Sequence, residues 1–322
     1  MYLNPTILNK IMKKVLVTGG AGYIGSLLIP KLLESGYSVI CIDNFLFSQF
    51  TLHDCCKYKN FKAVHGDVRD KGLIEKLINN VEFIIPLAAL VGAPLCDKDP
   101  FGAQSINSDS ILMMNKLLSD NHKVIMPVSN SGYGVSIDGK PCTEETPLNP
   151  VSIYGRTKVE AEKIIMSRTN SISLRLATVF GFSPRMRLDL LVNDFVFRAF
   201  YEKSILIFEG HFKRNYIHIQ DVTDALIYCI ENFKKMRSNV YNLGLEEANL
   251  SKLELAETIK KYIPDFKIVK SEYGKDPDKR NYIVSNKKIN DAGFIPKWSL
   301  EEGIKELVRG MPLLGKKKFS NI

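Results

Sequence analysis

The fold is decided by the stretch Thr18-Gly19-Gly20-Ala21-Gly22-Tyr23-Ile24-Gly25. It follows the apolar run Lys14–Val17 and opens an amphipathic stretch from Tyr23 to Ser35, so the glycines stand between an expected strand and an expected helix. Glycine permits a tight turn there and lets backbone amides approach a pyrophosphate at the helix N-terminus. A glycine-rich turn without a ligand is the alternative, but the strand–turn–helix context favours a dinucleotide loop.

An acidic residue stands where such a loop requires one. Asp43 ends the next expected strand, Ser38–Ile42, and lies 18 residues after Gly25, close to the ~20 at which a carboxylate contacts the adenosine ribose. A carboxylate there repels a 2′-phosphate, and no arginine occurs within residues 44–47. The sequence therefore predicts NAD rather than NADP, with contacts from Gly19, Gly22, Tyr23, Ile24, Gly25, Asp43 and Asn44.

Apolar runs and helical periodicity alternate through the first half of the chain. Further strands are expected at Phe61–Val64, Phe83–Leu87, Val124–Val128 and Ile172–Leu176. Helical spacing occurs at Gly72–Ile78, Gly102–Leu118 and Ile153–Ser167. This alternation predicts an α/β fold, a Rossmann-type doubly wound parallel sheet with helices on both faces.

The pattern becomes less regular after about Gly181. We therefore predict a cofactor-binding domain over residues 12–180 and a smaller C-terminal α/β substrate domain over residues 181–322. Residues of about 215–245, including Asp221–Glu231, are expected to pack back on the first domain. No internal repeat or low-complexity linker separates the two, so they should be intimately joined.

The composition indicates a globular enzyme. Hydrophobic residues make up 45% and charged residues 25% of the 322 residues. The net charge is +9, but the basic residues are scattered and the dense run Lys316–Lys318 is interpreted as a solvated tail, so no nucleic-acid partner is predicted. A moderate positive field suits phosphate-bearing ligands. No stretch approaches ~18 uninterrupted apolar residues, so no membrane span is expected.

The six cysteines, at positions 41, 55, 56, 96, 142 and 229, have no paired metal-ligand spacing. We interpret them as reduced thiols of a cytoplasmic protein, and no metal is expected. The segment Met1–Ile11 lacks the basic start and long apolar stretch of a signal peptide, and Met12 is an alternative start.

Two further patterns point to acid–base chemistry. Tyr154 and Lys158 are spaced i,i+4 at the start of an expected helix, which places both side chains on one face. A neighbouring ammonium and the positive nicotinamide ring should lower the tyrosine pKa from ~10, so that Tyr154 acts as a base. Ser129 directly follows the expected strand Val124–Val128, where its hydroxyl can bind the reacting oxygen. Alone, each pattern is more often a helix surface or a polar turn.

Together these residues resemble the extended short-chain dehydrogenase/reductase family, the NAD-dependent sugar epimerases and dehydratases, over nearly the whole chain. The resemblance implies that Ser129, Tyr154 and Lys158 are catalytic. It implies cofactor contacts from Asp67, Val68, Leu87, Ala88, Ala89 and Asn107, although Pro86 stands where the family often has histidine. It also implies a homodimer formed through Gly102–Leu118 and Ile153–Ser167.

In the second domain the resemblance implies a grip on a nucleotide diphosphate. Thr178 and Asn193 match donors to the phosphates, Arg214 matches a diphosphate arginine, and Arg280 is a second candidate. A planar guanidinium binds phosphate oxygens bidentately. A surface salt bridge is the alternative for either arginine. The substrate is therefore expected to be a nucleotide-diphosphate sugar.

The residues after Ser129 narrow the reaction. Dehydratases of the family carry Asp-Glu at the two positions after this serine. Its decarboxylating members carry glutamate, and its 3,5-epimerases cysteine, at the second of these positions. This chain has Asn130 and Ser131 there. Simple oxidation at C4, or 4-epimerisation, remains. A regulator that senses the cofactor without catalysis is a third hypothesis, which the intact Ser129, Tyr154 and Lys158 disfavour.

Five longer stretches resemble capsule enzymes that oxidise C4 of a GDP-linked heptose and reoxidise their NADH with 2-oxoglutarate. They are Leu87–Cys96, Asn130–Gly134, Arg175–Gly181, Ser183–Phe195 and Asp276–Arg280. This resemblance implies tightly held NAD and makes Arg185 and Arg187 candidates for contacts with the sugar or the keto acid. A few pocket residues set substrate identity, so a different sugar stays open.

Overall fold

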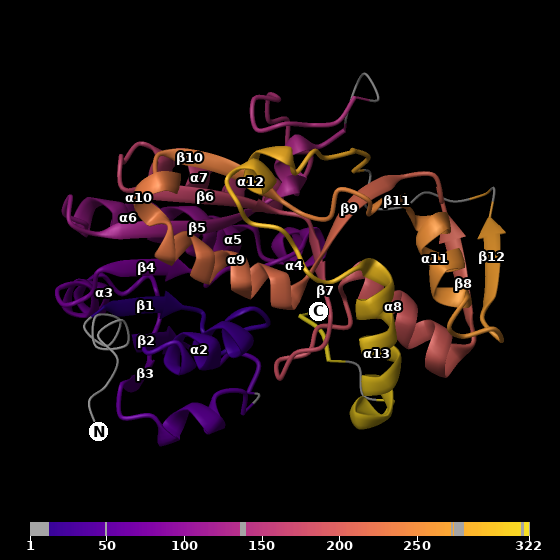
Figure 1. Cartoon of the computed structure of the whole chain (residues 1–322), viewed down its shortest axis with the longest axis horizontal. Coiled ribbons are helices and arrows are strands. Elements are labelled where there is room, and N and C mark those ends of the chain that lie inside the picture. Colours follow the sequence, from indigo (N-terminus) through magenta and orange to yellow (C-terminus); the bar gives the residue numbers. More distant parts are fainter. Residues whose placement is uncertain are drawn as a thin grey trace.

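Six strands from the first 176 residues of the chain and a later one, β10, align in parallel to form the large sheet (Figure 1). The computed structural model describes residues 13–48, 50–135, 140–271, 273, 280–316 and 319–321. Within them the large sheet has seven strands in the order β10-β6-β5-β4-β1-β2-β3, and each neighbouring pair is parallel. Their bounds are Lys14–Thr18 (β1), Ser38–Asp43 (β2), Phe61–His65 (β3), Phe83–Pro86 (β4), Lys123–Ser129 (β5), Ser171–Leu176 (β6) and Asn239–Leu243 (β10). The predicted α/β parallel sheet is confirmed.

Helices cover both faces of this sheet because the residues of each central strand alternate between two apolar layers. Val15 and Val17 of β1 belong to the core beneath α2 and α9, whereas Leu16 between them belongs to the core beneath α3, α6 and α7. The helices are Gly25–Glu34 (α2), Lys71–Ile78 (α3), Ser110–Leu117 (α6), Ile153–Met166 (α7) and Ile219–Glu231 (α9). The short helix Phe233–Met236 (α10) leads from α9 into β10.

The expected helix over residues 102–118 is divided in the structure. A short helix, Pro100–Gln104 (α5), is followed by a π-helical turn, Ser105–Asp109, before α6 begins. This wider turn contains Asn107, whose side chain bonds both backbone groups of Leu90. Irregular turns of this kind are concentrated at functional sites. Another short helix, Ala93–Lys98 (α4), lies between β4 and α5.

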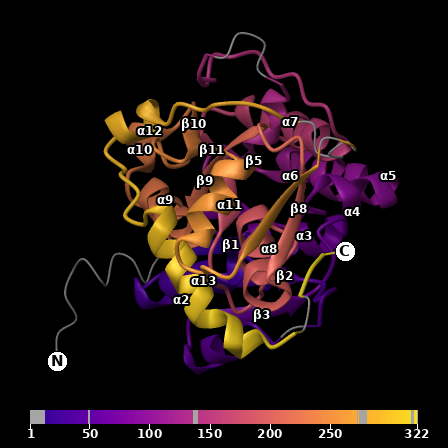
Figure 2. The same cartoon turned by 90° about the vertical axis from the view of Figure 1, so that its right-hand side faces the viewer.

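The second lobe lies beyond the carboxyl ends of the central strands and stands in front of the large sheet in Figure 2. Its small sheet has the order β11-β9-β7, and β8 pairs with β12 in parallel. We propose that the two lobes divide near residue 181, although α9 and β10 return to the large sheet. The elements of this part are Thr178–Phe180 (β7), Leu191–Phe197 (α8), Ser204–Phe208 (β8), Lys213–His218 (β9), Asn249–Ser251 (β11), Lys252–Lys260 (α11), Lys267–Ser271 (β12), Lys287–Asp291 (α12) and Leu300–Leu314 (α13).

Several predictions made from the sequence lie outside the described residues. These are the leader segment with Met12, the last two lysines of the basic run, and the first four residues of the stretch that ends at Arg280. In the part of the chain that is described, no helix is long and apolar enough to cross a membrane.

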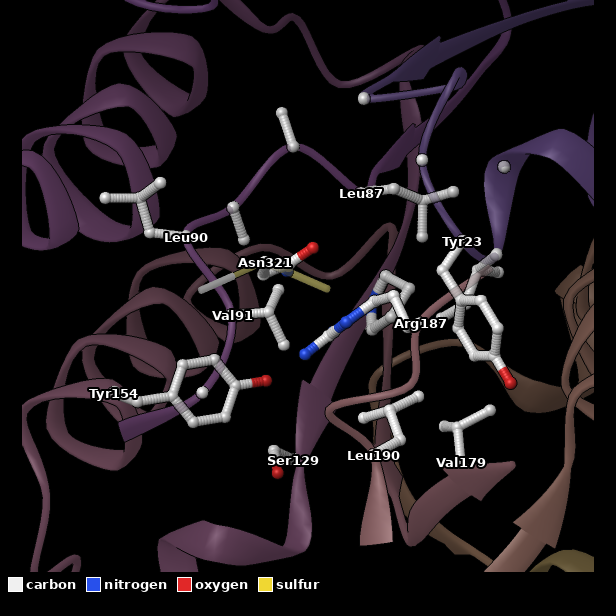
Figure 3. Close-up of a pocket in the computed structure, with 18 of the residues that line it drawn as sticks. Tyr23, Leu87, Leu90, Val91, Ser129, Tyr154, Val179, Arg187, Leu190 and Asn321 are labelled. Carbon is white, nitrogen blue, oxygen red and sulfur yellow. The ribbon is translucent and has the colours of Figure 1, made fainter. Parts of the chain in front are cut away.

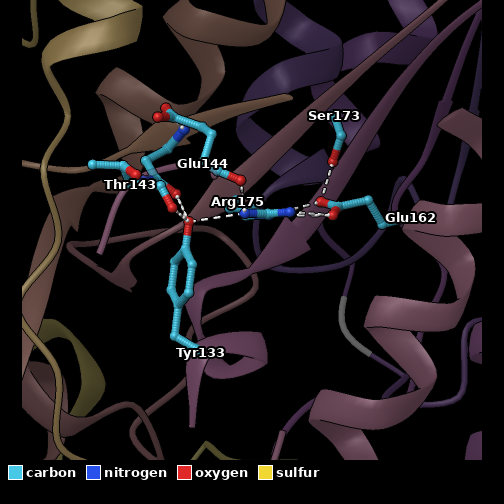
Figure 4. A network of polar contacts seen from close by, with 7 residues as sticks. Tyr133, Thr143, Glu144, Glu162, Ser173 and Arg175 are labelled. Carbon is cyan, nitrogen blue, oxygen red and sulfur yellow. Dashed lines mark hydrogen bonds and ion pairs between the residues drawn. The ribbon is translucent and has the colours of Figure 1, made fainter. Parts of the chain in front are cut away.

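A buried ion pair ties α7 to β6, the strand next to the edge strand β10 (Figure 4). Arg175 on β6 contacts Glu162 on α7 at 2.7 Å between Nη2 and Oε1, and both side chains are buried. Arg175 also donates to Tyr133 Oη at 2.9 Å and to the backbone oxygen of Glu144 at 3.1 Å, while Ser173 donates to Glu162 at 2.7 Å. Because Tyr133 lies in the turn after β5, one polar network fixes β6, α7 and this turn together.

Removing one member of this pair should destabilise the fold more than removing both. Arg175→Met leaves the carboxylate of Glu162 buried without its cation, so we expect the free energy of unfolding to fall by about 3–5 kcal/mol. The double variant Arg175→Met/Glu162→Met removes both charges and should lose less than the Arg175→Met variant. Urea unfolding followed by circular dichroism measures the stability of these variants and of Glu162→Met. If the stability lost by the double variant equals the sum of the losses of the two single variants, the ion pair does not have this role.

Candidate functional site

A cavity of about 760 Å³ lies where the large sheet meets the second lobe. Its walls come from the glycine loop, the carboxyl ends of β2, β4 and β5 and the start of α7, faced by β7, β9 and the segment before α8. Figure 3 shows Tyr23, Tyr154, Ser129 and Arg187 around it. Of the residues predicted from the sequence, those that line the cavity are Gly19, Gly22, Tyr23, Ile24, Gly25, Asp43, Asn44, Asp67, Val68, Leu87, Ala88, Ala89, Ser129, Tyr154, Lys158, Thr178, Arg185, Arg187, Arg214 and Arg280.

The glycine loop packs so closely that two of its glycines have no room for a side chain. Gly19 has φ +67°, and a Cβ there would lie 2.5 Å from the backbone nitrogen of Ala88. A Cβ on Gly25 would lie 2.5 Å from the backbone oxygen of Gly20. The loop therefore presents mainly backbone to the cavity where α2 begins, which is the arrangement that a dinucleotide pyrophosphate requires. The residues present fit NAD.

Asp43 is fixed against this loop. One carboxylate oxygen accepts a hydrogen bond from the backbone N–H of Ala21 at 2.9 Å, and the other accepts from Phe45 at 2.8 Å. Each oxygen keeps a further lone pair, so the carboxylate is placed to accept from ribose hydroxyls. Asp67, on the next wall, is held by Arg69 at 2.6 Å, and its hydrogen bonds with Arg69 lower the pKa of the Asp67 carboxyl.

Tyr154 and Lys158 both face the cavity from the first turns of α7. The helix begins after Ser152, whose hydroxyl accepts from the backbone N–H of Gly155 at 3.1 Å and caps it. Burial raises the pKa of Tyr154, whereas the charges of Arg187 and Arg280 and a hydrogen bond with Ser129 lower it. The predicted fall in the tyrosine pKa is therefore not produced by the protein's own groups, because desolvation of the phenolate outweighs these cations.

Lys158 carries an unusual lysine pKa for the same physical reason. Burial lowers the pKa of Lys158 to about 8, and the charges of Cys96 and Glu162 act in the opposite direction. Glu162 lies one turn further along α7, in the buried ion pair with Arg175. The network that holds the helix therefore also helps to keep the ammonium protonated.

Asn107 and Asn193 do not line the cavity that the structure describes. Asn107 accepts from the N–H of Leu90 at 2.8 Å and donates to its carbonyl at 2.9 Å, so it fixes the segment after β4 from behind. Asn193 accepts from Gly181 and donates to Tyr23 Oη and to the backbone of Arg187. The predicted direct contact of Asn193 with phosphate is replaced by an indirect role, because its amide is already engaged in the protein.

Arg185 and Arg187, both candidates for contacts with the sugar or the keto acid, lie in different parts of the cavity. Arg185 lies with its guanidinium 3.9 Å from the ring centroid of Phe47, in the loop after β2, and donates to Asn321 at 2.6 Å. Burial lowers the pKa of Arg185 to about 10, and the charge of Asp43 is among the groups that raise it. Arg185 therefore lies on the cofactor side of the cavity, and we do not retain it as a substrate residue.

The other arginines remain in position to meet a substrate. The guanidinium of Arg187 extends toward the side of the cavity that holds Tyr154, and it pairs with Asp189 (Figure 3). Arg214 on β9 is fully buried against the cavity, with its guanidinium 5.6 Å from the ring of Tyr282. Arg280 and Thr178 complete this wall.

Asp189, Tyr282 and Asn321 are among the polar or aromatic residues of the wall that sequence reasoning missed. Asp189 stands two residues after Arg187, and this charge alternation is a pattern that a search for ion pairs would find. Tyr282 follows Arg280 in a segment without regular structure, and Asn321 lies in the segment after α13. Nothing local in the sequence indicates either one. In the described part of the chain, no group of three or more histidine, cysteine or acidic residues is arranged to hold a metal ion.

A glycine loop suited to a dinucleotide on one wall and a tyrosine–lysine pair on another are typical of the class of dinucleotide-dependent oxidoreductases. Residues 15–244 match the model of the NAD dependent epimerase/dehydratase family, and the chain belongs to that family. It is an NAD-dependent enzyme of the kind that includes nucleotide-sugar epimerases and dehydratases.

Three relatives illustrate the range of this family. The chain is 29% identical over 307 residues to a low-salt glycan biosynthesis protein of Haloferax volcanii, covering 91% of this chain and 97% of that protein. It is similar to the dTDP-glucose 4,6-dehydratase of Bacillus anthracis in complex with NAD, with 25% identity, 92% and 96% coverage and a TM-score of 0.78. It is also similar to the UDP-glucose 4-epimerase of Thermotoga maritima with UDP-glucose, with 25% identity, 93% and 99% coverage and a TM-score of 0.80.

The low pKa of Lys158 predicts a loss of activity at alkaline pH. The ammonium is present below its pKa of about 8 and is lost above it, so we expect kcat/KM to fall as the pH rises through this value. Lys158→Arg keeps the positive charge because a guanidinium stays protonated, and its residual activity should show no such fall. Steady-state rates measured between about pH 6 and pH 10, a range that spans both protonation states of Lys158, test this prediction. Identical alkaline limbs in the two proteins would refute it.

Proposed function

We propose that this enzyme uses NAD to oxidise the C4 hydroxyl of GDP-D-glycero-D-manno-heptose to a 4-keto product, in the synthesis of a surface polysaccharide. The observation that carries the proposal is the pair that follows Ser129. Asn130 and Ser131 are both buried at 1% exposure and neither lines the cavity in the described structure. An amide and a hydroxyl do not exchange protons at neutral pH, so the site keeps the groups for oxidation without the acid and base that elimination of water requires.

The side chains divide the chemistry between them. The Ser129 hydroxyl donates to O4 of the sugar, and the phenolate of Tyr154 takes the O4 proton as the C4–H bond breaks. When bound, NAD supplies the ring that accepts the C4 hydride. The ammonium of Lys158 and the guanidinium of Arg187 supply positive charge near the phenolate, and Arg187 lowers the pKa of Tyr154 more than Arg280 does. The products are a 4-keto sugar and a protonated tyrosine.

The arginines of the second lobe supply the grip on the diphosphate. We assign this role to Arg214 and Arg280, with the hydroxyl of Thr178 beside them, because all three line the wall that faces α7. A buried guanidinium binds a phosphate pair strongly since its planar donors match two oxygens at once. Asn193 supports this grip indirectly, by fixing the backbone of Arg187.

The heptose is proposed from the five stretches that resemble GDP-heptose 4-dehydrogenases, and 2-oxoglutarate from the same resemblance. The second candidate is a nucleotide-sugar 4-epimerase, in which the hydride returns to the opposite face of C4. The likeness to the UDP-glucose 4-epimerase of Thermotoga maritima favours this candidate. Both reactions begin with the same oxidation by Tyr154, so they are distinguished by the product and not by the first step.

The product decides between them. The purified enzyme, incubated with GDP-D-glycero-D-manno-heptose and 2-oxoglutarate, should give a nucleotide sugar lighter by two hydrogens together with 2-hydroxyglutarate, as measured by mass spectrometry. Tyr154→Phe should keep bound NAD and lose turnover by at least about 100-fold, because the proton acceptor is removed. An unchanged heptose, with an isomer of equal mass formed from UDP-glucose, would replace the dehydrogenase with the epimerase. Full turnover by Tyr154→Phe would remove Tyr154 from the mechanism.

We also propose that two copies associate through α5, α6 and α7. Phe101 and Leu112 on the first two of these helices are exposed large apolar side chains, at 81% and 41%. Light scattering during gel filtration should therefore give twice the 36.4 kDa of one chain. Leu112→Glu places a charge on this surface and should shift the mass toward the single chain, whereas Leu313→Glu, at an exposed position on α13, should not. A single-chain mass for the unmodified protein would contradict the dimer.

A further inference from the structure

Ser131 is hydrogen-bonded to the serine that the mechanism uses. Its hydroxyl donates to Ser129 Oγ at 2.7 Å, and its backbone N–H donates to the same oxygen at 3.2 Å. Ser131 is 1% exposed and lies in the short helical turn Asn130–Tyr133 that follows β5. Ser129 therefore receives two donors from the protein interior while it lines the cavity on its other side.

These two bonds determine what the Ser129 hydroxyl has left to offer. A serine oxygen has two acceptor lone pairs and one proton. Both lone pairs are engaged by Ser131, so the group that remains is the proton. Tyr154 lies near Ser129 on the wall of the cavity (Figure 3), and the Ser129 hydroxyl is one of the groups that lower the pKa of Tyr154. A hydroxyl that accepts a hydrogen bond becomes a better donor, so the bonds from Ser131 strengthen what Ser129 can donate into the cavity.

We propose that Ser131 is a positioning residue that holds Ser129 as a hydrogen-bond donor toward Tyr154 and the reacting sugar oxygen. This inference rests on the proposed function, in which Tyr154 carries the proton of the oxidised hydroxyl. A fixed donor at Ser129 stabilises an oxygen that gains negative charge, whether it is the phenolate of Tyr154 or the oxygen of the sugar as its proton leaves. Ser131 acts through Ser129 and does not touch the substrate.

A purely structural role for Ser131 makes a different prediction. The backbone N–H of Ser131 already satisfies Ser129 as the cap of the turn, and this bond survives when the side chain is shortened. If the hydroxyl of Ser131 only stabilised the turn, its loss would lower the unfolding free energy and leave the pH dependence of the rate unchanged. The pH profile therefore separates the two roles.

Other charged and titratable groups face Tyr154 from every wall. Arg187 precedes α8, Arg280 lies in the segment that carries Tyr282, Cys96 belongs to α4 and Lys158 lies on the tyrosine's own helix. None of them is bonded to Ser131, so they remain the same when Ser131 is changed. A shift of the tyrosine titration on substitution of Ser131 therefore reports on Ser129.

The test is a double-mutant cycle measured on the enzyme with GDP-D-glycero-D-manno-heptose and 2-oxoglutarate, or with UDP-glucose if that is the sugar that reacts. Ser131→Ala should lower kcat between about 2-fold and 10-fold, the range expected for one hydrogen bond, and leave KM unchanged. The rising limb of the pH–rate profile should move to higher pH, because Ser129 is no longer held as a donor and stabilises the phenolate less. In a Ser129→Ala background the same substitution should have no further effect.

Ser108→Ala is the matched control. Ser108 is also 1% exposed, and its hydroxyl has no hydrogen-bond partner among the described residues, so both rate and pH profile should be unchanged. Equal additional losses from Ser131→Ala in the unmodified and the Ser129→Ala proteins, or an unmoved pH limb, would overturn the proposal.

A second measurement keeps the inference separate from the proposed function. The phenolate absorbance of Tyr154 is obtained by subtracting the pH titration of Tyr154→Phe from that of the unmodified protein with NAD bound. Ser131→Ala should move this difference titration to higher pH, with no substrate required. Failure of the enzyme to oxidise any nucleotide sugar would refute the proposed function, whereas an unmoved titration would refute the role of Ser131.

Discussion

The buried pairing of Arg175 with Glu162 is the interaction on which the candidate site depends. Glu162 lies two turns after Tyr154 on α7, and Arg175 lies on β6 beside the strand that ends at Ser129. Two charges taken out of water need each other and every available hydrogen bond, so α7 and β6 are held in one relative position. Of the side chains proposed as catalytic, Tyr154 and Lys158 lie on this helix and Ser129 ends β5, the strand paired with β6, so the ion pair helps to fix their relative position.

Burial also disfavours the charged forms of Tyr154 and Lys158, which the proposed mechanism uses. It raises the pKa of Tyr154 and lowers the pKa of Lys158 to about 8, so neither group gains reactivity from desolvation alone. The protein compensates with cations from the second lobe, Arg187 and Arg280, and with the hydroxyl of Ser129. In the proposed mechanism, acid–base chemistry thus requires both lobes, since the base comes from one and the charges that favour its ionised form come from the other.

Much of the fold and part of the site could be predicted from the sequence. Periodicity located the strands of the large sheet up to β6 within one or two residues, since each buried strand is a short apolar run. The seventh strand, β10, falls within the broad range of residues expected to pack on the first domain, but the sequence does not predict it as a strand. Its five residues are too few to show a clear hydrophobic period. The helix expected over residues 102–118 contains a π-helical turn around Asn107, which no local pattern announces.

The sequence by itself determined what short-range geometry controls. The glycines from Gly19 to Gly25 need a particular backbone, Asp43 ends a strand next to them, and Tyr154 and Lys158 share a helix face because they are one turn apart. Only the tertiary structure decided which distant side chains meet: Arg185 lies against Phe47 and Asn321, Asn193 is engaged by Tyr23, and Arg187 faces Tyr154. Long-range contacts depend on how two lobes pack, and the electrostatics of a buried site follows from that packing rather than from residue spacing.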